Sequence, residues 1–425
     1  MRARLARLGA VGASGMFLAA IIIACSDSGR PPVGGTSSGV LPETDGNFLD
    51  VIDAGDGSDV DLSYCRNTNK DGDETDVDCG GSCGGCALGK TCAVDKDCAD
   101  EGAKCTNKVC AKCSDGKTDG DETDVDCGGK ACGPCGVGKQ CKVGPDCKSE
   151  ACTANACACP PNMTIVARAT GGAYCVDSSE VTKGQYNKFI TANVPVGTQI
   201  PACSTNTTFI PRGAWPPAVS PGPLEFNLGL PVHYVDWCDA YAYCKWAKKE
   251  LCGTVNGGPI GAADTNDATK DAWYNACTAQ GTKGWPYDVA FDDTKCNGIG
   301  RPGTQVEGPI TATSRGFGYA TNSDDNVYQV ATSDIAGNIT DYVNKACQGG
   351  SVGLYQMSGN VAEWEDSCDS TAANANCRLR GGSYAAGDVS TDLACNANRT
   401  MQRIPAMDPG GAAQLKDVGI RCCLY

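Results

Sequence analysis

The sequence is poor in histidine, in aromatic residues and in positive charge. Of its 425 residues one is histidine and 6% are aromatic, while the formal net charge is −15. A single histidine excludes a metal site built from several imidazoles, and no Gly-x-Ser-x-Gly elbow comes with a usable histidine, which excludes a serine hydrolase. The acidic balance argues against nucleic acid as a partner, because phosphate binding needs a basic face.

Long apolar runs are also missing, except at the N-terminus. Three arginines (Arg2, Arg4 and Arg7) precede a mostly apolar stretch, residues 8–24, that ends in Ile-Ile-Ala before Cys25. This pattern resembles the lipobox of bacterial lipoproteins, so we expect a signal peptide over 1–24 and a lipid on Cys25 that anchors the chain in a bilayer. The alternatives are a simple secretory signal or an uncleaved membrane helix, although the run is short for a spanning helix. The expected location is the bacterial cell envelope, at the outer membrane or cell surface rather than the inner membrane.

Residues 25–64 are rich in Ser, Gly, Pro and Asp and have few large apolar side chains. Such a stretch does not bury enough surface to offset the entropy lost on ordering. We therefore expect a disordered, acidic linker that holds the rest of the chain away from the membrane.

Cysteine is abundant, and its distribution divides the chain. Apart from Cys25 there are 30 cysteines. Eight fall within 65–112, eight within 113–158 and 14 within 159–425, so each part has an even number and is able to pair internally. We expect these three ranges to be two cysteine-rich repeats and a larger C-terminal domain.

The first two ranges, repeat 1 (65–112) and repeat 2 (113–158), are copies of one unit. The run from Asp71 to Gly81 recurs from Asp119 to Gly129, which gives a period of about 48 residues. They resemble cysteine-rich repeats of secreted proteins from myxobacteria and related bacteria. Each copy has too few apolar residues for a core, so disulfides must stabilise it. Zinc is the alternative, since two Cys-x-x-Cys pairs have ligand spacing, but export to an oxidising compartment favours disulfides. Eight cysteines allow 105 pairings, which leaves the connectivity open.

An acidic run in each repeat has partial EF-hand spacing. Asn67 to Asp78 places oxygen-bearing side chains at most ligand positions of such a loop, but Lys117 occupies one of them in the second copy. Neither copy is flanked by amphipathic helices. The interpretation we favour is a solvated acidic turn, with calcium as the alternative.

The range 159–425 contains tryptophan and tyrosine and shows local periodicity. Residues 236–251 predict one amphipathic helix, with apolar side chains at three- and four-residue spacing. A second short helix is expected over 271–277. The remainder predicts short strands and loops rich in Gly, Asn and Ser.

Five segments of this range, in order, resemble the sulfatase-modifying-factor family, that of the formylglycine-generating enzyme. They are Tyr174–Thr182, Pro231–Trp237 continuing to Trp246, Trp273–Cys277, Tyr355–Trp364, and Arg380–Tyr384 followed by Gly419–Cys422. The resemblance implies an α+β, C-type-lectin-like fold that is low in regular secondary structure. It covers nothing before Cys159.

The resemblance also implies a chemistry that this chain lacks. Catalytic members carry two copper-binding cysteines at two and seven residues after the aromatic residue of Arg-Gly-Gly-Ser-aromatic, and soft thiolates suit copper(I). Here those positions are Ala386 and Thr391, so copper is not expected. A related branch uses histidines on iron, but the single histidine, His233, is expected to be a packing residue near a helix start.

Disulfides and a calcium site are further implications of the resemblance. The family pattern implies the bridges Cys244–Cys422 and Cys277–Cys395. Proximity in sequence alone suggests Cys159–Cys175 and Cys368–Cys377, and Cys423 needs a separate partner. For calcium, a structural cofactor of the family, the positions carried over are Gln356 and Glu363 as side-chain ligands and Gly359 and Val361 as carbonyl ligands. A loop held by hydrogen bonds alone is the alternative.

Three functions are consistent with these observations. The first is a non-catalytic binding or structural module on a lipid-anchored surface protein, with an unknown envelope or extracellular ligand. The second is a diverged enzyme of the formylglycine-generating family, supported by the scaffold only. The third is a structural envelope component in which the repeats are the functional part. A cleft near Ser383, Tyr384 and Ala386 lined by titratable groups is the observation that would keep a ligand or substrate site open.

Overall fold

A computed structural model describes residues 62–213, 215, 228–292, 295–296, 331–333, 339–342, 347–385, 389–406 and 414–425. The chain divides into two units, Met1–Val60 and Asp61–Tyr425, and every described residue belongs to the second. The expected signal segment, Cys25 and nearly all of the expected linker lie outside the described residues. Within the described part of the chain, no helix is long and apolar enough to cross a membrane.

The two repeats contain short strands, single helical turns and the same disulfide order. Each bonds its first cysteine to its third, second to fourth, fifth to seventh and sixth to eighth. Disulfides rather than zinc therefore hold both copies. The regular elements are the hairpins β1 (Lys104–Thr106) with β2 (Val109–Ala111) and β3 (Cys152–Thr153) with β4 (Ala156–Cys157), and the 3-10 turns η1 (Ser63–Arg66), η2 (Asp95–Asp97) and η3 (Gly144–Asp146).

The acidic runs of the repeats cap backbone amides. One carboxylate oxygen of Asp78 accepts hydrogen bonds from the amides of Asn67 and Thr68, at 2.8 and 3.0 Å. In repeat 2 Asp126 accepts hydrogen bonds from the amides of Asp115 and Gly116, at 2.7 and 3.0 Å. Because these carboxylates accept hydrogen bonds from amides within a tight loop, they stabilise the turn in both copies.

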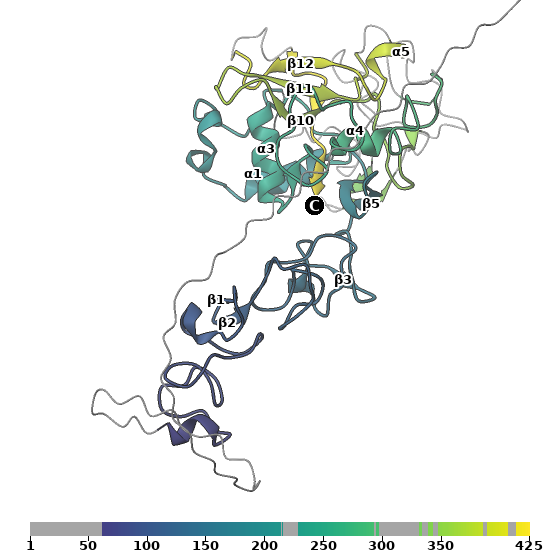
Figure 1. The fold of residues 1–425 in the computed structure, drawn as a ribbon. Coiled ribbons are helices and arrows are strands. Elements are labelled where there is room, and N and C mark those ends of the chain that lie inside the picture. The colour runs from purple at the N-terminus through teal and green to yellow at the C-terminus, as the bar shows by residue number, and fades with distance from the viewer. Residues whose placement is uncertain are drawn as a thin grey trace, which may run out of the picture. The chain divides into compact units, whose positions relative to one another are not determined.

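The C-terminal domain has two four-stranded sheets; Figure 1 labels β5 of one and β10, β11 and β12 of the other. The first is antiparallel, in the order β5 (Met163–Ala167), β6 (Ala173–Asp177), β14 (Cys422–Leu424) and β7 (Glu250–Leu251). The second has the order β12 (Arg399–Gln402), β11 (Asn376–Arg380), β10 (Ala362–Cys368) and β13 (Val418–Gly419), in which β10 and β13 are parallel. A separate hairpin pairs β8 (Ala331–Ser333) with β9 (Ile339–Tyr342).

Short helices, three of them with a side-chain cap, complete the described part of the domain. They are α1 (Lys183–Thr191), α3 (Trp237–Trp246), α4 (Ala272–Cys277) and α5 (Val389–Asp392), with the 3-10 turns η4 (Val196–Thr198) and η5 (Pro201–Cys203). Thr182 and Asp236 form capping boxes at the starts of α1 and α3, and Asp271 caps α4. Mixed helix and sheet with little regular secondary structure is the fold class that the resemblance implied, and it is confirmed.

The prediction of one helix over 236–251 is wrong at its C-terminal end. The helix α3 ends at Trp246, and Lys248 adopts a left-handed backbone conformation with a φ of 58°. That turn reverses the chain and delivers Leu251 to strand β7, where it pairs with Cys422. The apolar pattern extends past the helix because Leu251 is also buried, but as part of strand β7.

The core lies between α1, α3 and the β10–β11 sheet. Its buried aromatic side chains include Tyr186, Phe189, Trp237 and Trp364, and Figure 1 shows α1 and α3 next to each other beside the sheet. Seven disulfides join the domain, among them both bridges that the resemblance implied: Cys159–Cys175, Cys203–Cys238, Cys244–Cys422, Cys252–Cys423, Cys277–Cys395, Cys296–Cys347 and Cys368–Cys377.

Candidate functional site

An open pocket of about 560 Å³ lies beside the Arg-Gly-Gly-Ser-Tyr segment of the C-terminal domain. Its lining comes from β10 and β11, the segment after β11, the residues from α5 to β12, and the residues before β13. The lining residues are Ala362, Leu379, Gly382, Ser383, Ala385, Asp392, Ala397, Asn398, Arg399, Gln414, Lys416 and Asp417. Small and apolar residues therefore share the pocket with seven polar or charged ones.

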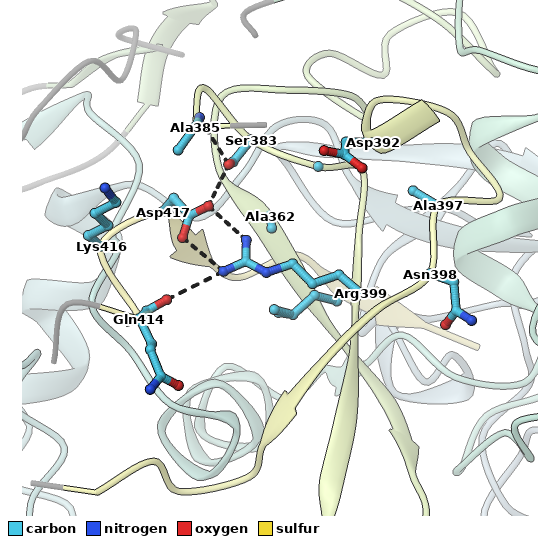
Figure 2. A pocket seen from close by; sticks show the side chains of 12 residues that line it. Ala362, Ser383, Ala385, Asp392, Ala397, Asn398, Arg399, Gln414, Lys416 and Asp417 are labelled. Atoms are coloured by element: carbon cyan, nitrogen blue, oxygen red, sulfur yellow. Dashed lines mark hydrogen bonds and ion pairs between the residues drawn. The ribbon is translucent and has the colours of Figure 1, made fainter. Parts of the chain in front are cut away.

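A chain of hydrogen bonds links three of these residues (Figure 2). The hydroxyl of Ser383 donates to the Oδ2 atom of Asp417 at 2.5 Å. Arg399 donates to both oxygens of the same carboxylate, at 2.7 and 3.1 Å, in a two-pronged ion pair. The Asp417 side chain is 6% exposed and that of Arg399 is 38% exposed, so the guanidinium faces the pocket from a fixed position.

Other polar side chains surround this network. Figure 2 shows Lys416 on one side of the Arg399–Asp417 pair and Asp392 with Asn398 on the other. The amide oxygen of Asn398 accepts from Arg378 at 2.6 Å, which fixes the side chain and leaves its NH₂ group as the donor toward other partners. Positive, negative and amide groups thus face one pocket from different sides.

Gly382 makes the close approach that forms this wall. Its φ is 62°, and a Cβ atom there would lie 2.2 Å from the carbonyl oxygen of Asp392. Only glycine suits that conformation and that contact. The Arg-Gly-Gly-Ser motif therefore brings Ser383 and Asp392 to the same pocket.

The single histidine packs behind the pocket. His233 is 4% exposed, and its Nδ1 atom lies 2.8 Å from the carbonyl oxygen of Lys416. Tyr384 donates its hydroxyl to the same carbonyl at 3.4 Å. These contacts fit the expected packing role of His233, which lies just before helix α3.

Only one of the two positions that hold copper-binding cysteines in the family is among the described residues. Thr391 lies in α5 and is exposed, one residue before the pocket residue Asp392. Ala386 lies outside the described residues. All 30 cysteines from Cys65 to Cys423 are in disulfides, so the described residues offer no thiol to a soft metal ion.

One of the residues carried over as calcium ligands, Glu363, belongs to a buried ion pair. Arg421 donates to both oxygens of Glu363 at 2.8 and 2.9 Å, and Trp273 donates to one of them at 2.6 Å. Both charged side chains are fully buried, and Arg421 also donates to the backbone oxygen of Gln356. The guanidinium of Arg421 therefore already neutralises Glu363, the one carboxylate of the set. A positive charge at this place does not fit a dipositive ion. Calcium at Gln356, Gly359, Val361 and Glu363 stays a prediction, which a calcium titration by calorimetry tests.

A second buried carboxylate sits next to this pair. Glu180 accepts from the amide of Val361 at 3.1 Å and from the side chain of Asn360 at 3.0 Å. Complete burial, followed by the negative charge of Glu363, raises the pKa of Glu180 to about 8. These groups order the loop before β10 and lie outside the pocket.

Comparison with known proteins identifies the domain. Residues 165–424 match the model of the sulfatase-modifying factor enzyme 1-like domain. The chain belongs to this sulfatase-modifying factor family. The crystal structure of CarF is similar, with 16% sequence identity and a TM-score of 0.32. The match covers 59% of this chain and 86% of the CarF chain. No curated protein sequence matches the chain.

Membership of the sulfatase-modifying factor family explains why the motif segments were recognisable and the rest of the pocket was not. Ser383 lies in a quoted motif, whereas Asn398, Arg399 and Asp417 come from segments that carried no motif. The one available signal was indirect: Asp417 stands two residues before the Gly-Ile-Arg-Cys segment. Their convergence follows from the pairing of β11 with β12 and of β10 with β13.

Proposed function

We propose that this sulfatase-modifying factor domain is a non-catalytic binding module, and that the pocket at Ser383, Arg399 and Asp417 holds its ligand. The proposal rests on one observation. The family motif borders an open pocket lined by polar groups, while alanine and threonine stand at the two sequence positions of the family's copper-binding cysteines, 386 and 391. The fold thus keeps a recognition surface without the groups that activate oxygen.

The hydrogen bonding in the pocket supports binding over catalysis. The hydroxyl of Ser383 donates a hydrogen bond to Asp417, whose charge Arg399 neutralises through two further hydrogen bonds. Both oxygens of that carboxylate are thus held by a guanidinium, which makes Asp417 a positioning group for the serine. The same fixed donors and acceptors are well suited to orient a polar ligand. The alternative, a diverged enzyme, draws support from Asp392 and Lys416, two further titratable groups in the pocket lining.

The first experiment separates the two functions. Purified full-length protein is incubated with copper(I), oxygen and a peptide containing Cys-x-Pro-x-Arg, and aldehyde formation is followed by mass spectrometry. We expect no conversion by the natural sequence. The variant A386C/T391C places thiols at the two family positions and is expected to bind copper(I) above the level of the parent. Conversion by the natural sequence would overturn the proposal.

The second experiment concerns the pocket itself. Arrays of glycans and of peptides are probed with the full-length protein, and each hit is measured again with R399A and K416A. A hit that belongs to the pocket is expected to weaken at least tenfold with R399A, because a fixed ion pair and its donors are lost. The matched control is K104A, an exposed lysine in repeat 1. Hits that bind R399A and K416A as strongly as the parent would place the ligand elsewhere.

We further propose that the protein is exported and anchored through a lipid on Cys25. The supporting observations are the three arginines, the apolar run and the Ile-Ile-Ala-Cys sequence, followed by a polar linker. The substitution C25A is expected to move the protein from the membrane fraction to the soluble fraction and to abolish incorporation of labelled fatty acid. Unchanged fractionation and labelling of C25A would exclude the anchor.

A further inference from the structure

A buried glutamate contacts a disulfide in each of the two repeats. Glu122 is 7% exposed, and its Oε1 atom lies 3.1 Å from the sulfur of Cys132, which is bonded to Cys113. In repeat 1 the equivalent Glu74 is 6% exposed and approaches the sulfur of Cys83 to 3.4 Å. In each copy the carboxylate and both sulfur atoms of the bond lie within 4.8 Å of one another.

The backbone fixes each glutamate in this position. The second carboxylate oxygen of Glu122 accepts from the amide of Asp119 at 3.2 Å. Glu74 accepts from the amide of Asp71 at the same distance. The contact with sulfur is therefore a repeated feature of the unit, although the loops around it differ in length between the copies.

The neighbouring disulfide of each repeat has a hydroxyl in place of a carboxylate. The hydroxyl of Thr123 lies 3.8 Å from the sulfur of Cys135, which is bonded to Cys127. Thr75 has the same relation to Cys86 in repeat 1. Burial does not distinguish the bonds, because in all four one cysteine is buried and the other is half-buried.

We infer that the buried glutamate protects its disulfide from reduction, so that in each repeat the threonine-contacted bond opens before the glutamate-contacted bond. When a dithiol reductant attacks Cys113, its thiolate forms a new S–S bond and the old bond breaks. The electron pair leaves on the sulfur of Cys132 as a thiolate. The second thiol of the reductant then displaces Cys113 and closes a cyclic disulfide, so two electrons and two protons end on the cysteines.

The charge of the departing sulfur decides the rate. A thiolate forming 3.1 Å from a buried carboxylate is destabilised by repulsion, which makes Cys132 a poor leaving group. The approaching anionic reductant meets the same repulsion. Beside Cys135 the threonine hydroxyl is able to donate a hydrogen bond to the new thiolate, which favours departure.

The test follows each bond separately. Oxidised full-length protein is treated with limiting dithiothreitol at pH 8, free thiols are alkylated at intervals, and mass spectrometry gives the rate for each cysteine pair. In the natural sequence Cys127–Cys135 is expected to open before Cys113–Cys132. E122Q, which removes the charge and nearly keeps the shape, is expected to open Cys113–Cys132 about tenfold faster relative to Cys141–Cys152 in the same repeat. E74Q is expected to do the same to Cys65–Cys83.

The control variant and a pH series exclude a general loosening of the repeat. T123V is matched in size and is expected to slow Cys127–Cys135 while leaving Cys113–Cys132 unchanged. With a neutral phosphine reductant, the difference between E122Q and the natural sequence is expected to shrink on acidification, because burial raises the pKa of Glu122 and protonation removes its charge. Equal relative rates for E122Q and the natural sequence at pH 8, or Cys113–Cys132 opening first, would overturn the inference.

Discussion

The repeats and the C-terminal domain solve the same problem of stability by different means. The buried cluster of repeat 1 consists of Cys86, Cys92 and Cys110 with further cysteines packed against them. The domain instead buries large aromatic side chains such as Trp364 and Phe189. A unit of fewer than 50 residues has too little volume for a sufficient apolar core, whereas a domain of some 260 residues does not depend on covalent bonds in the same way.

Carboxylates differ between the two regions as strongly as the cores do. In the repeats several of them cap backbone amides: the amide of Thr91, at 2.7 Å, lowers the pKa of Asp76 to about 2. In the domain Glu180 is completely buried, and burial raises its pKa to about 8. Acid is therefore expected to destabilise the repeats, and base the C-terminal domain.

Removing one disulfide in each region is the strongest test of this comparison. C98A/C110A deletes a bond of repeat 1, and C277A/C395A deletes a buried bond of the domain. A native disulfide contributes about 2–5 kcal/mol, which approaches the whole stability of a small unit. We expect the first variant to lose the fold of repeat 1 and the second to keep the domain folded with a lower Tm. Limited proteolysis with mass spectrometry of the fragments reports each region separately.

The opposite result has a clear meaning. If repeat 1 of C98A/C110A resists protease as the parent does, hydrogen bonds such as those that Asp78 accepts from the amides of Asn67 and Thr68 hold the unit without that bond. If the domain of C277A/C395A is degraded instead, its core is weaker than its aromatic content indicates.

Truncation of a core aromatic residue tests the other half of the comparison. Trp364 is completely buried and donates its indole N–H to the carbonyl oxygen of Val235 at 3.0 Å. W364A is expected to destabilise the domain by about 3–5 kcal/mol, because a large cavity and an unpaired carbonyl remain. The matched change in a repeat is V94A, at a side chain 48% exposed, for which we expect less than about 0.5 kcal/mol. Denaturant unfolding followed by tryptophan fluorescence measures the domain, where all six tryptophans lie, and near-UV circular dichroism, to which disulfides contribute, follows the repeat.

The sequence was informative wherever chemistry was local. Period, cysteine number and oxidising compartment predicted two disulfide-bonded repeats, and short motifs predicted the family fold. The connectivity of the repeats was not predictable, because it depends on which sulfurs the amide-capped turns bring together. Spacing alone does not encode that folding.

Other features depended on distant parts of the chain. Helix α3 ends early because Lys248 adopts a left-handed conformation, which residue type does not announce. Arg399 and Asp417 lie near Ser383 because β12 and β13 form the two edges of the same sheet. The loop at Val361 was recognisable from its motif. Only the structure shows that Arg421 neutralises Glu363 in that loop.

Alkaline pH is expected to weaken the domain. The pKa of Glu180 in the folded state, about 8 because of burial and then Glu363, lies above its unfolded value, so the folded state holds a proton that the unfolded state releases. The associated stability is fully present below about pH 4 and is lost as pH rises toward 8. We expect the domain's Tm to fall between pH 5 and 8, and to fall less in E180Q. The exposed variant E101Q in repeat 1 serves as control, and a slope identical in all three proteins would contradict the prediction.

Acid is expected to weaken the repeats, with the smallest effect of the four. The Thr91 amide, opposed by partial burial and aided by further hydrogen bonds, lowers the pKa of Asp76. Its contribution is present above the unfolded pKa near 4 and is lost as pH falls toward 2. Hydrogen exchange at the Thr91 amide is therefore expected to lose protection over that range in the natural sequence. D76N is expected to lack this protection already at pH 5, and D124N is expected to affect the Gln140 amide of repeat 2 in the same way. Since each amide reports on its own repeat, protection that survives at Thr91 in D76N would show that the turn, not the carboxylate, shields it.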